Sequence, residues 1–90
     1  MDELDPKNEP IAAWCDLSEL HVRLKDGRHL STPLWWYPRL LNAAPAQRNN
    51  VELSFIGIHW PDIDEDISVR GLLLGVKAPD AVEPTGHEAA

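Results

Sequence analysis

Cysteine is nearly absent from this chain of 90 residues, since Cys15 is the only one. A single thiol cannot build an internal disulfide framework, so the sequence excludes a disulfide-rich secreted domain and indicates a reducing compartment. Long apolar runs are also missing, and no stretch approaches the roughly 18 residues that a membrane-spanning helix needs. The acidic N-terminus carries no signal-peptide pattern. We therefore expect a cytoplasmic protein with no membrane partner.

Basic residues are scarce, with 8 Lys and Arg against 15 Asp and Glu and a formal net charge of −7. Such a chain is poorly suited to phosphate backbones, so we expect no nucleic-acid binding on its own. Residues 1–10 and 76–90 hold most of the excess acid and lack apolar periodicity. They are predicted to be disordered acidic tails, dispensable for folding, around a single domain at residues 11–75. A core this small could gain burial from a partner or in a homodimer.

Alternation of apolar and polar residues predicts the strands. The clearest strand is Leu20–Lys25, and Arg28–Leu34 returns beside it. A two-residue Asp-Gly loop would leave Leu30 on the polar face. A three-residue loop with Gly27 in the left-handed position instead pairs Val22 with Leu30 and gathers the apolar residues on one face. We therefore predict a bulged hairpin.

The remaining elements are short. Further strands are expected at Ile11–Leu17, Val51–Phe55 and Ile58–Trp60, with short helices opened by Pro38 and Pro45. A change in the phase of alternation suggests a bulge or bend at Gly57. The expected fold class is α+β: a small antiparallel sheet, made of the hairpin and one or two further strands, packed with short helices.

The densest stretch of the chain is Gly57–Gly75, which we interpret as a strand, an acidic turn and a short helix. Ser68 suits the N-cap of that helix, and Gly75 suits the left-handed position after it. Acids just ahead of a helix would interact favourably with its positive end.

The acids of this turn also raise the question of a metal. Asp62, Asp64 and Asp66 match the first alternating positions of a calcium loop, but Ile67 and Leu73 stand where its glycine and bidentate glutamate belong. We therefore expect no cofactor, and no calcium or magnesium binding at this turn tighter than about millimolar.

Catalytic motifs are missing. His59 and Asp62 could be drawn as a base and its orienting acid, yet no nucleophile with a supporting motif accompanies them. A lone histidine in a strand is more often structural. We expect no catalytic residues and no enzyme.

Aromatic and charged residues suggest a contact surface instead. Trp35 and Trp36 cannot both face inward if their stretch is extended, although local bending could bury both. Trp and Arg are common hot-spot residues, and charged side chains steer association. The predicted partner-binding residues are Trp36, Arg39, His59, Asp62, Asp64 and Asp66.

Three motifs carry a resemblance to a known family: Leu20–Arg28 (LHVRLKDGR), Pro33–Leu40 (PLWWYPRL) and Gly57–Ser68 (GIHWPDIDEDIS). With them the chain resembles bacterial domain-of-unknown-function family 2442. The resemblance implies an α+β fold on a small antiparallel sheet and no established activity. Members often lie beside another small protein in toxin–antitoxin-like gene pairs, and some carry a helix-turn-helix domain after this one. The sequence given stops at Ala90 without such a domain, so we do not expect the DNA-binding role here.

These observations favour a non-enzymatic protein-binding module, antitoxin-like in character, whose acidity suits a small basic protein. An accessory or regulatory subunit of a larger bacterial assembly is the alternative. A small metal-dependent hydrolase ranks below both.

Overall fold

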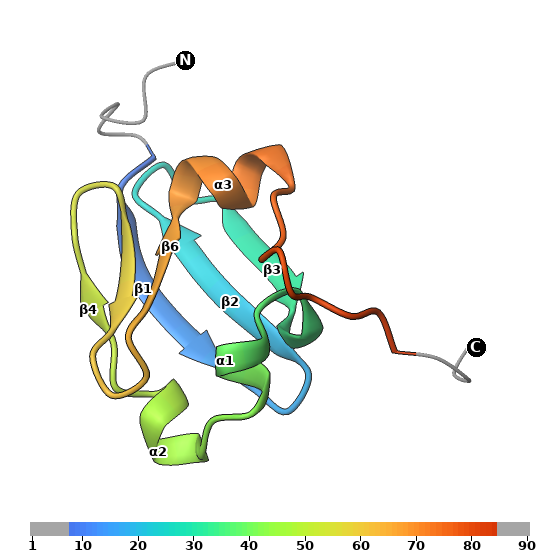
Figure 1. The fold of residues 1–90 in the computed structure, drawn as a ribbon. Helices are drawn as coiled ribbons and strands as arrows, with labels where there is room; N and C mark the ends of the chain where they lie inside the picture. Colours follow the sequence, from blue (N-terminus) through green and yellow to red (C-terminus); the bar gives the residue numbers. More distant parts are fainter. Residues whose placement is uncertain (1–7, 85–90) are drawn as a thin grey trace.

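The structure is a computed structural model that describes residues 8–84. Six short strands form two three-stranded antiparallel sheets (Figure 1). Sheet A contains β1 (Pro10–Cys15), β2 (Glu19–Leu24) and β3 (His29–Pro33), in that order. Sheet B contains β4 (Glu52–Leu53), β5 (Gly57–Trp60) and β6 (Glu65–Ser68). The helical elements are η2 (Leu34–Trp36), α1 (Pro38–Leu41), α2 (Pro45–Arg48) and α3 (Val69–Leu74). The α+β class is confirmed, but the strands divide between two sheets rather than one.

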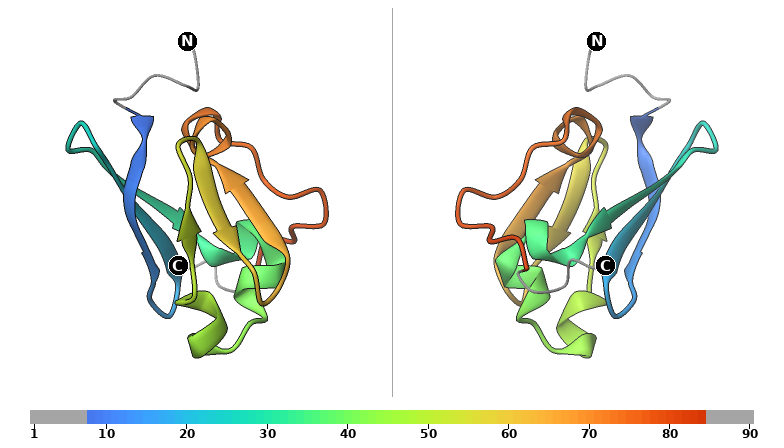
Figure 2. Two further views of the ribbon diagram at one scale, coloured as in Figure 1. Left: turned by 90° about the vertical axis from the view of Figure 1, so that its left-hand side faces the viewer. Right: turned by 90° about the vertical axis from the view of Figure 1, so that its right-hand side faces the viewer.

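The core lies between the two sheets, which face each other with α1 and α2 at one end (Figure 2). Trp60 of β5 is its largest member and has no exposed surface. Its indole Nε1–H donates to the Arg48 carbonyl at 3.0 Å, so the ring that fills the core also fixes the end of α2. The buried apolar residues are Leu20, Val22, Leu24, Leu34, Tyr37, Leu40, Ile58, Trp60, Ile67 and Val69.

The β2–β3 hairpin has the predicted register, because Val22 pairs with Leu30. Gly27 has a φ of 97°, the left-handed conformation that the three-residue loop requires. The apolar face decided this register, since a slip of one residue would turn Val22 outward.

The acidic stretch is arranged differently from the prediction. A turn at residues 61–64 closes a β5–β6 hairpin, and the acids that follow it lie in strand β6 rather than at a helix terminus. No acidic residue lies in the first turn of α3, so the expected electrostatic role at that helix is wrong. The two predicted caps are confirmed: the Ser68 hydroxyl accepts from the Gly71 N–H at 2.9 Å, and Gly75 has a φ of 76°.

The predicted bend lies just before Gly57, at residues 55–56, and no bulge forms at Gly57 itself. Gly57 allows close packing instead. It pairs with Ser68 in the regular β5–β6 ladder, and a Cβ there would lie 2.6 Å from the Ile67 carbonyl oxygen. The strand before it is shorter than predicted, since only Glu52–Leu53 pairs with β5.

The ends of the described chain pack on the domain. Asn8 is buried and accepts from the Arg28 guanidinium at 2.8 Å. After α3, the Ala78 N–H donates to the Trp36 carbonyl at 3.0 Å, so this segment contacts η2 beyond the predicted boundary at residue 75. The rest of the predicted tails, residues 1–7 and 85–90, lies outside the described residues. Within residues 8–84, no helix is long and apolar enough to cross a membrane.

Candidate functional site

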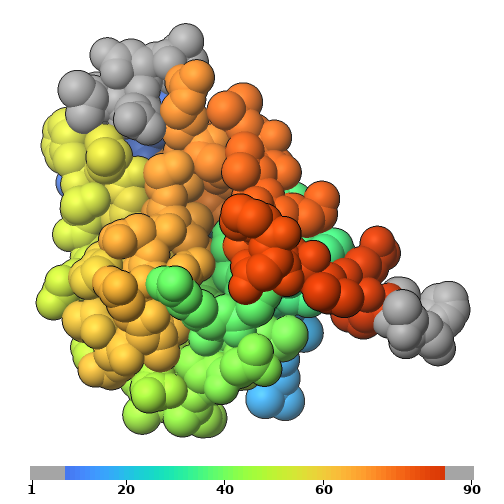
Figure 3. Space-filling model, in the orientation of Figure 1, coloured from blue at the N-terminus to red at the C-terminus, as the bar shows by residue number. Residues whose placement is uncertain are grey.

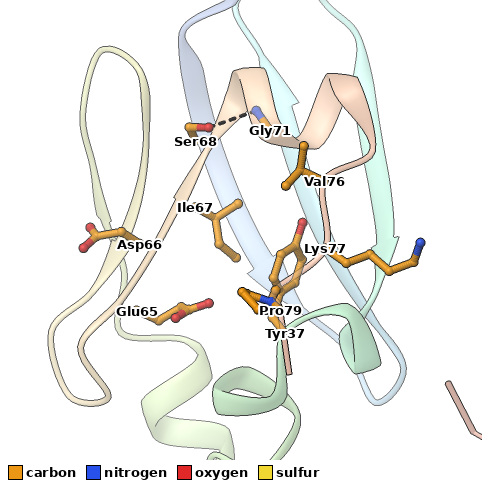
Figure 4. A pocket seen from close by; sticks show the side chains of 10 residues that line it. Tyr37, Glu65, Asp66, Ile67, Ser68, Gly71, Val76, Lys77 and Pro79 are labelled. Atoms are coloured by element: carbon orange, nitrogen blue, oxygen red, sulfur yellow. Dashed lines mark hydrogen bonds between the residues drawn. The ribbon is translucent and has the colours of Figure 1, made fainter. Parts of the chain in front are cut away.

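A hollow lined by described residues runs beside β6. Its walls are β6 on one side and Val76–Pro79 on the other, with Tyr37 between them (Figure 4). This part is open to solvent and has a volume of about 290 Å³. A second hollow continues it past Arg39 to Asp80, and the two share Glu65, Ala78 and Pro79. We call the combined feature the β6 groove. Figure 3 shows the segment after α3 crossing this face beside β6.

Strand β6 presents backbone hydrogen-bonding groups along this groove. It is an edge strand, and within the described residues no further strand pairs on its outer side. The Val69 N–H donates to the Ile56 carbonyl at 2.9 Å, and bonded and non-bonded pairs alternate along an antiparallel ladder. Asp66 and Ser68 therefore occupy the positions whose backbone groups point away from β5. Such an edge can accept another strand.

Tyr37 contributes a hydroxyl with no partner. The residue is 4% exposed, and its hydroxyl is buried without a hydrogen bond to any described residue. Burial, with a smaller contribution from Glu65, raises the pKa of Tyr37 to about 12, so the hydroxyl remains a donor. Figure 4 shows it pointing toward Val76. A buried unpaired donor costs about 1–3 kcal/mol, which an acceptor entering the groove would relieve.

Glu65 supplies an acceptor nearby. Its side chain is 15% exposed, and desolvation raises its pKa, an effect that the Arg39 guanidinium opposes. Asp66, Asp80 and Asp64 raise this pKa further. Arg39 lies 3.7 Å from the carboxylate but is largely exposed, so the contact is weak. The groove therefore holds an under-compensated acid that a cationic group would stabilise.

Two of the predicted partner-binding residues meet at one end of the groove. Arg39 donates to the backbone carbonyl of Asp64, the residue with a φ of 54° in the β5–β6 turn. This contact ties α1 to the turn and leaves the Asp64 side chain exposed.

Of the other predicted residues, Asp66 lines the groove, whereas His59 and Asp62 lie outside it. His59 and Asp66 are opposite each other on β5 and β6, with His59 Nδ1 2.8 Å from the Asp66 carboxylate. This contact raises the pKa of His59. Asp62 accepts from the Asn50 amide at 3.0 Å. Figure 4 shows the Asp66 side chain directed away from Tyr37, so the six predicted residues do not form one site.

Trp35 and Trp36 are both half-buried. In an extended strand they would point to opposite faces, but here they lie in the 3-10 helix η2, which lets both rings contact the protein. Trp36 contacts the chain's own C-terminal segment: the Lys77 ammonium lies 4.7 Å from the centre of its ring. Much of the surface that we expected to meet a partner is therefore engaged within the molecule.

Sequence reasoning missed Tyr37 and Glu65 as functional candidates. Neither residue is among the predicted partner-binding residues. The spacing of Glu65 and Ile67 could have indicated the role of Glu65. Residues two apart in a strand share a face, so Glu65 lies on the same core-facing side of β6 as Ile67.

The fold and the groove define a small α+β domain of two three-stranded sheets with an open strand edge. Residues 11–78 match the family described as protein of unknown function (DUF2442), and the chain belongs to this family. It is similar to the crystal structure of a protein of unknown function from Rhodospirillum rubrum ATCC 11170, with 27% identity and a TM-score of 0.70. The match covers 81% of this chain and 93% of that one. No curated protein matches.

Proposed function

We propose that this domain is a non-enzymatic protein-binding module that takes an extended segment of a partner into the β6 groove. The observation that carries the proposal is an edge strand facing a groove that also contains an unpaired buried donor. An added strand would bond to the outward backbone groups of Asp66 and Ser68, the mode called β-augmentation. A carbonyl of the same segment would accept from the Tyr37 hydroxyl.

The charges around the groove favour a basic partner. Glu65, Asp64, Asp66 and Asp80 lie on or near its walls, against Arg39 and Lys77. A lysine or arginine beside Glu65 would compensate a desolvated carboxylate, and the net charge of −7 would speed encounter with a cationic protein. A small basic protein bound in this way would make the module antitoxin-like. The unpaired thiol of Cys15 suits the reducing cytoplasm.

Selection from a library of random peptides tests the proposal. We expect enriched peptides to be extended and to carry Lys or Arg. Two N-methylated forms of a selected peptide should behave differently, one methylated at its odd-numbered amides and one at its even-numbered amides. Only every second residue of an added strand bonds to the edge, so one form should lose binding and the other should keep it. If both methylated forms bind equally well, the peptide does not bind as an added strand.

Variants of the protein separate binding from folding. Tyr37→Phe and Glu65→Gln should each weaken peptide binding by about 1 kcal/mol or more without lowering the melting temperature. Glu52→Gln, an exposed acid on β4 outside the groove, is the matched control and should bind normally. If both groove variants bind the selected peptides as the wild type does, the partner lies elsewhere.

A further inference from the structure

A second group of chemically active side chains lies on the outer face of sheet A. Glu19 and His21 alternate with the buried Leu20 and Val22, so they project away from the core. Asp16, in the turn before β2, completes the group. His21 Nε2 lies 2.7 Å from the Asp16 carboxylate and 3.9 Å from that of Glu19. One ligand atom from each of the three lies within 4.8 Å of the other two.

The His21 ring is held on several sides. Trp14 stacks on it with ring centres 5.3 Å apart and planes 12° from parallel. On the edge away from the carboxylates, Nδ1 lies 3.0 Å from His29 Nε2 and 3.2 Å from the Ser31 hydroxyl. The side chain is only 14% exposed. The ring is therefore fixed before any ligand arrives, with Nε2 directed at the two acids.

Asp16 is oriented by hydrogen bonds to one of its two carboxylate oxygens. Its Oδ1 accepts from the backbone N–H groups of Ser18 at 2.9 Å and Glu19 at 2.7 Å. The other oxygen, Oδ2, is left for His21. Hydrogen bonds that orient a ligating carboxylate, and an acceptor for the second nitrogen of a ligating histidine, are the usual supports of a metal site.

We propose that Asp16, Glu19 and His21 form a binding site for a divalent transition-metal ion, with zinc as the representative ion. Imidazole nitrogen with two carboxylate oxygens suits zinc, whereas calcium and magnesium need larger sets of oxygen ligands. Ligand atoms of a tetrahedral zinc lie about 3.4 Å apart, given bonds of about 2.1 Å. The 3.9 Å between His21 Nε2 and the Glu19 carboxylate can close by rotation of the Glu19 side chain. The 2.7 Å between His21 Nε2 and Asp16 Oδ2 must lengthen when the metal replaces the shared proton, which a small rotation of the exposed Asp16 carboxylate allows. His21 Nδ1–H would then donate to His29 or Ser31, and water would complete the shell.

The site is separate from the β6 groove, because it lies on the outer face of sheet A, away from sheet B. Its effect would be to tie the turn before β2 to the sheet. Binding to the folded state alone raises stability with ligand concentration, so zinc should raise the melting temperature of the whole chain.

Titration of the full-length chain, without an added histidine tag, with zinc chloride in a calorimeter tests the proposal. We expect one zinc ion per chain at this site and a higher melting temperature. His21→Gln should abolish this binding, and Glu19→Gln, which alters an exposed side chain, should weaken it at least tenfold while leaving the metal-free melting temperature unchanged. Ser31→Ala with His29→Gln should weaken it roughly tenfold or more, as loss of supporting groups does. Cobalt at the same site should give a tetrahedral absorption spectrum that His21→Gln removes.

His59→Gln is the matched control, because His59 also contacts an aspartate at 2.8 Å but belongs to no such three-ligand group among the described residues. It should bind zinc as the wild type does. Calcium and magnesium are control ions and should not compete. If the wild type binds no zinc, or if Glu19→Gln and His21→Gln bind as well as the wild type, the proposal is wrong.

Discussion

Trp60 joins the two halves of the fold through both its ring and its indole N–H. The ring fills the space between the sheets, while the N–H holds the end of α2. Trp60→Ala should cost about 3–5 kcal/mol of unfolding free energy. Trp60→Phe keeps an aromatic ring but leaves the Arg48 carbonyl unpaired, and should cost about 1–3 kcal/mol. Urea denaturation followed by circular dichroism measures both. A Trp60→Phe variant as stable as the wild type would show that this hydrogen bond contributes nothing.

Glu65 makes stability depend on pH in a direction unusual for a carboxylate. Its pKa in the folded state is raised above 4.5, chiefly by desolvation, so the folded state holds its proton more tightly than the unfolded state does. Its contribution to stability is fully present below pH 4.5 and is lost as the pH rises through the raised pKa.

Glu65→Gln should therefore melt at a higher temperature than the wild type at pH 7. The advantage should shrink as the pH falls through the raised pKa, because the protonated glutamic acid resembles glutamine. Thermal melts of both proteins between pH 4 and pH 7 provide the measurement. A constant difference across this range would assign the effect to packing rather than to ionisation.

At the scale of elements, the β5–β6 hairpin depends on the absence of a side chain at Gly57. A Cβ there would lie 2.6 Å from one backbone atom of β6 and 3.1 Å from another, and neither can move without opening the ladder. Gly57→Ala should cost about 3 kcal/mol. Gly71→Ala is the control, because its Cβ would meet only the Ser68 hydroxyl at 3.0 Å and alanine favours a helix. Chemical denaturation should rank these two variants far apart, and equal stabilities would contradict the close-packing role.

At the scale of the whole molecule, we expect the domain to extend past the predicted boundary at residue 75. Removing residues 76–90 would eliminate the bond from Ala78 to Trp36 and the position of Lys77 over the Trp36 ring. This truncation should cost about 1–3 kcal/mol. Removing only residues 85–90 should leave the melting temperature unchanged. Calorimetry of the two truncated proteins decides the point, since equal melting temperatures would restore the boundary at residue 75.

The parts of the fold that the sequence predicted correctly depend on interactions between residues close together in the chain. The Val22–Leu30 register follows from one apolar face and one glycine, and the caps of α3 follow from Ser68 and Gly75. Each depends on residues within a few positions of one another, where backbone geometry leaves few alternatives.

The candidate site was beyond such reasoning, because its parts come from distant segments. Tyr37 follows η2, Glu65 begins β6, and Val76–Pro79 was expected to be a free tail. The sequence by itself determined the α+β class, the β2–β3 hairpin and the caps of α3. Only the tertiary structure decided that Glu65 and Asp66 lie in an edge strand and that the C-terminal segment turns that edge into a groove. The physical reason is that burial and desolvation, which give these groups their chemistry, exist only after the sheets have packed.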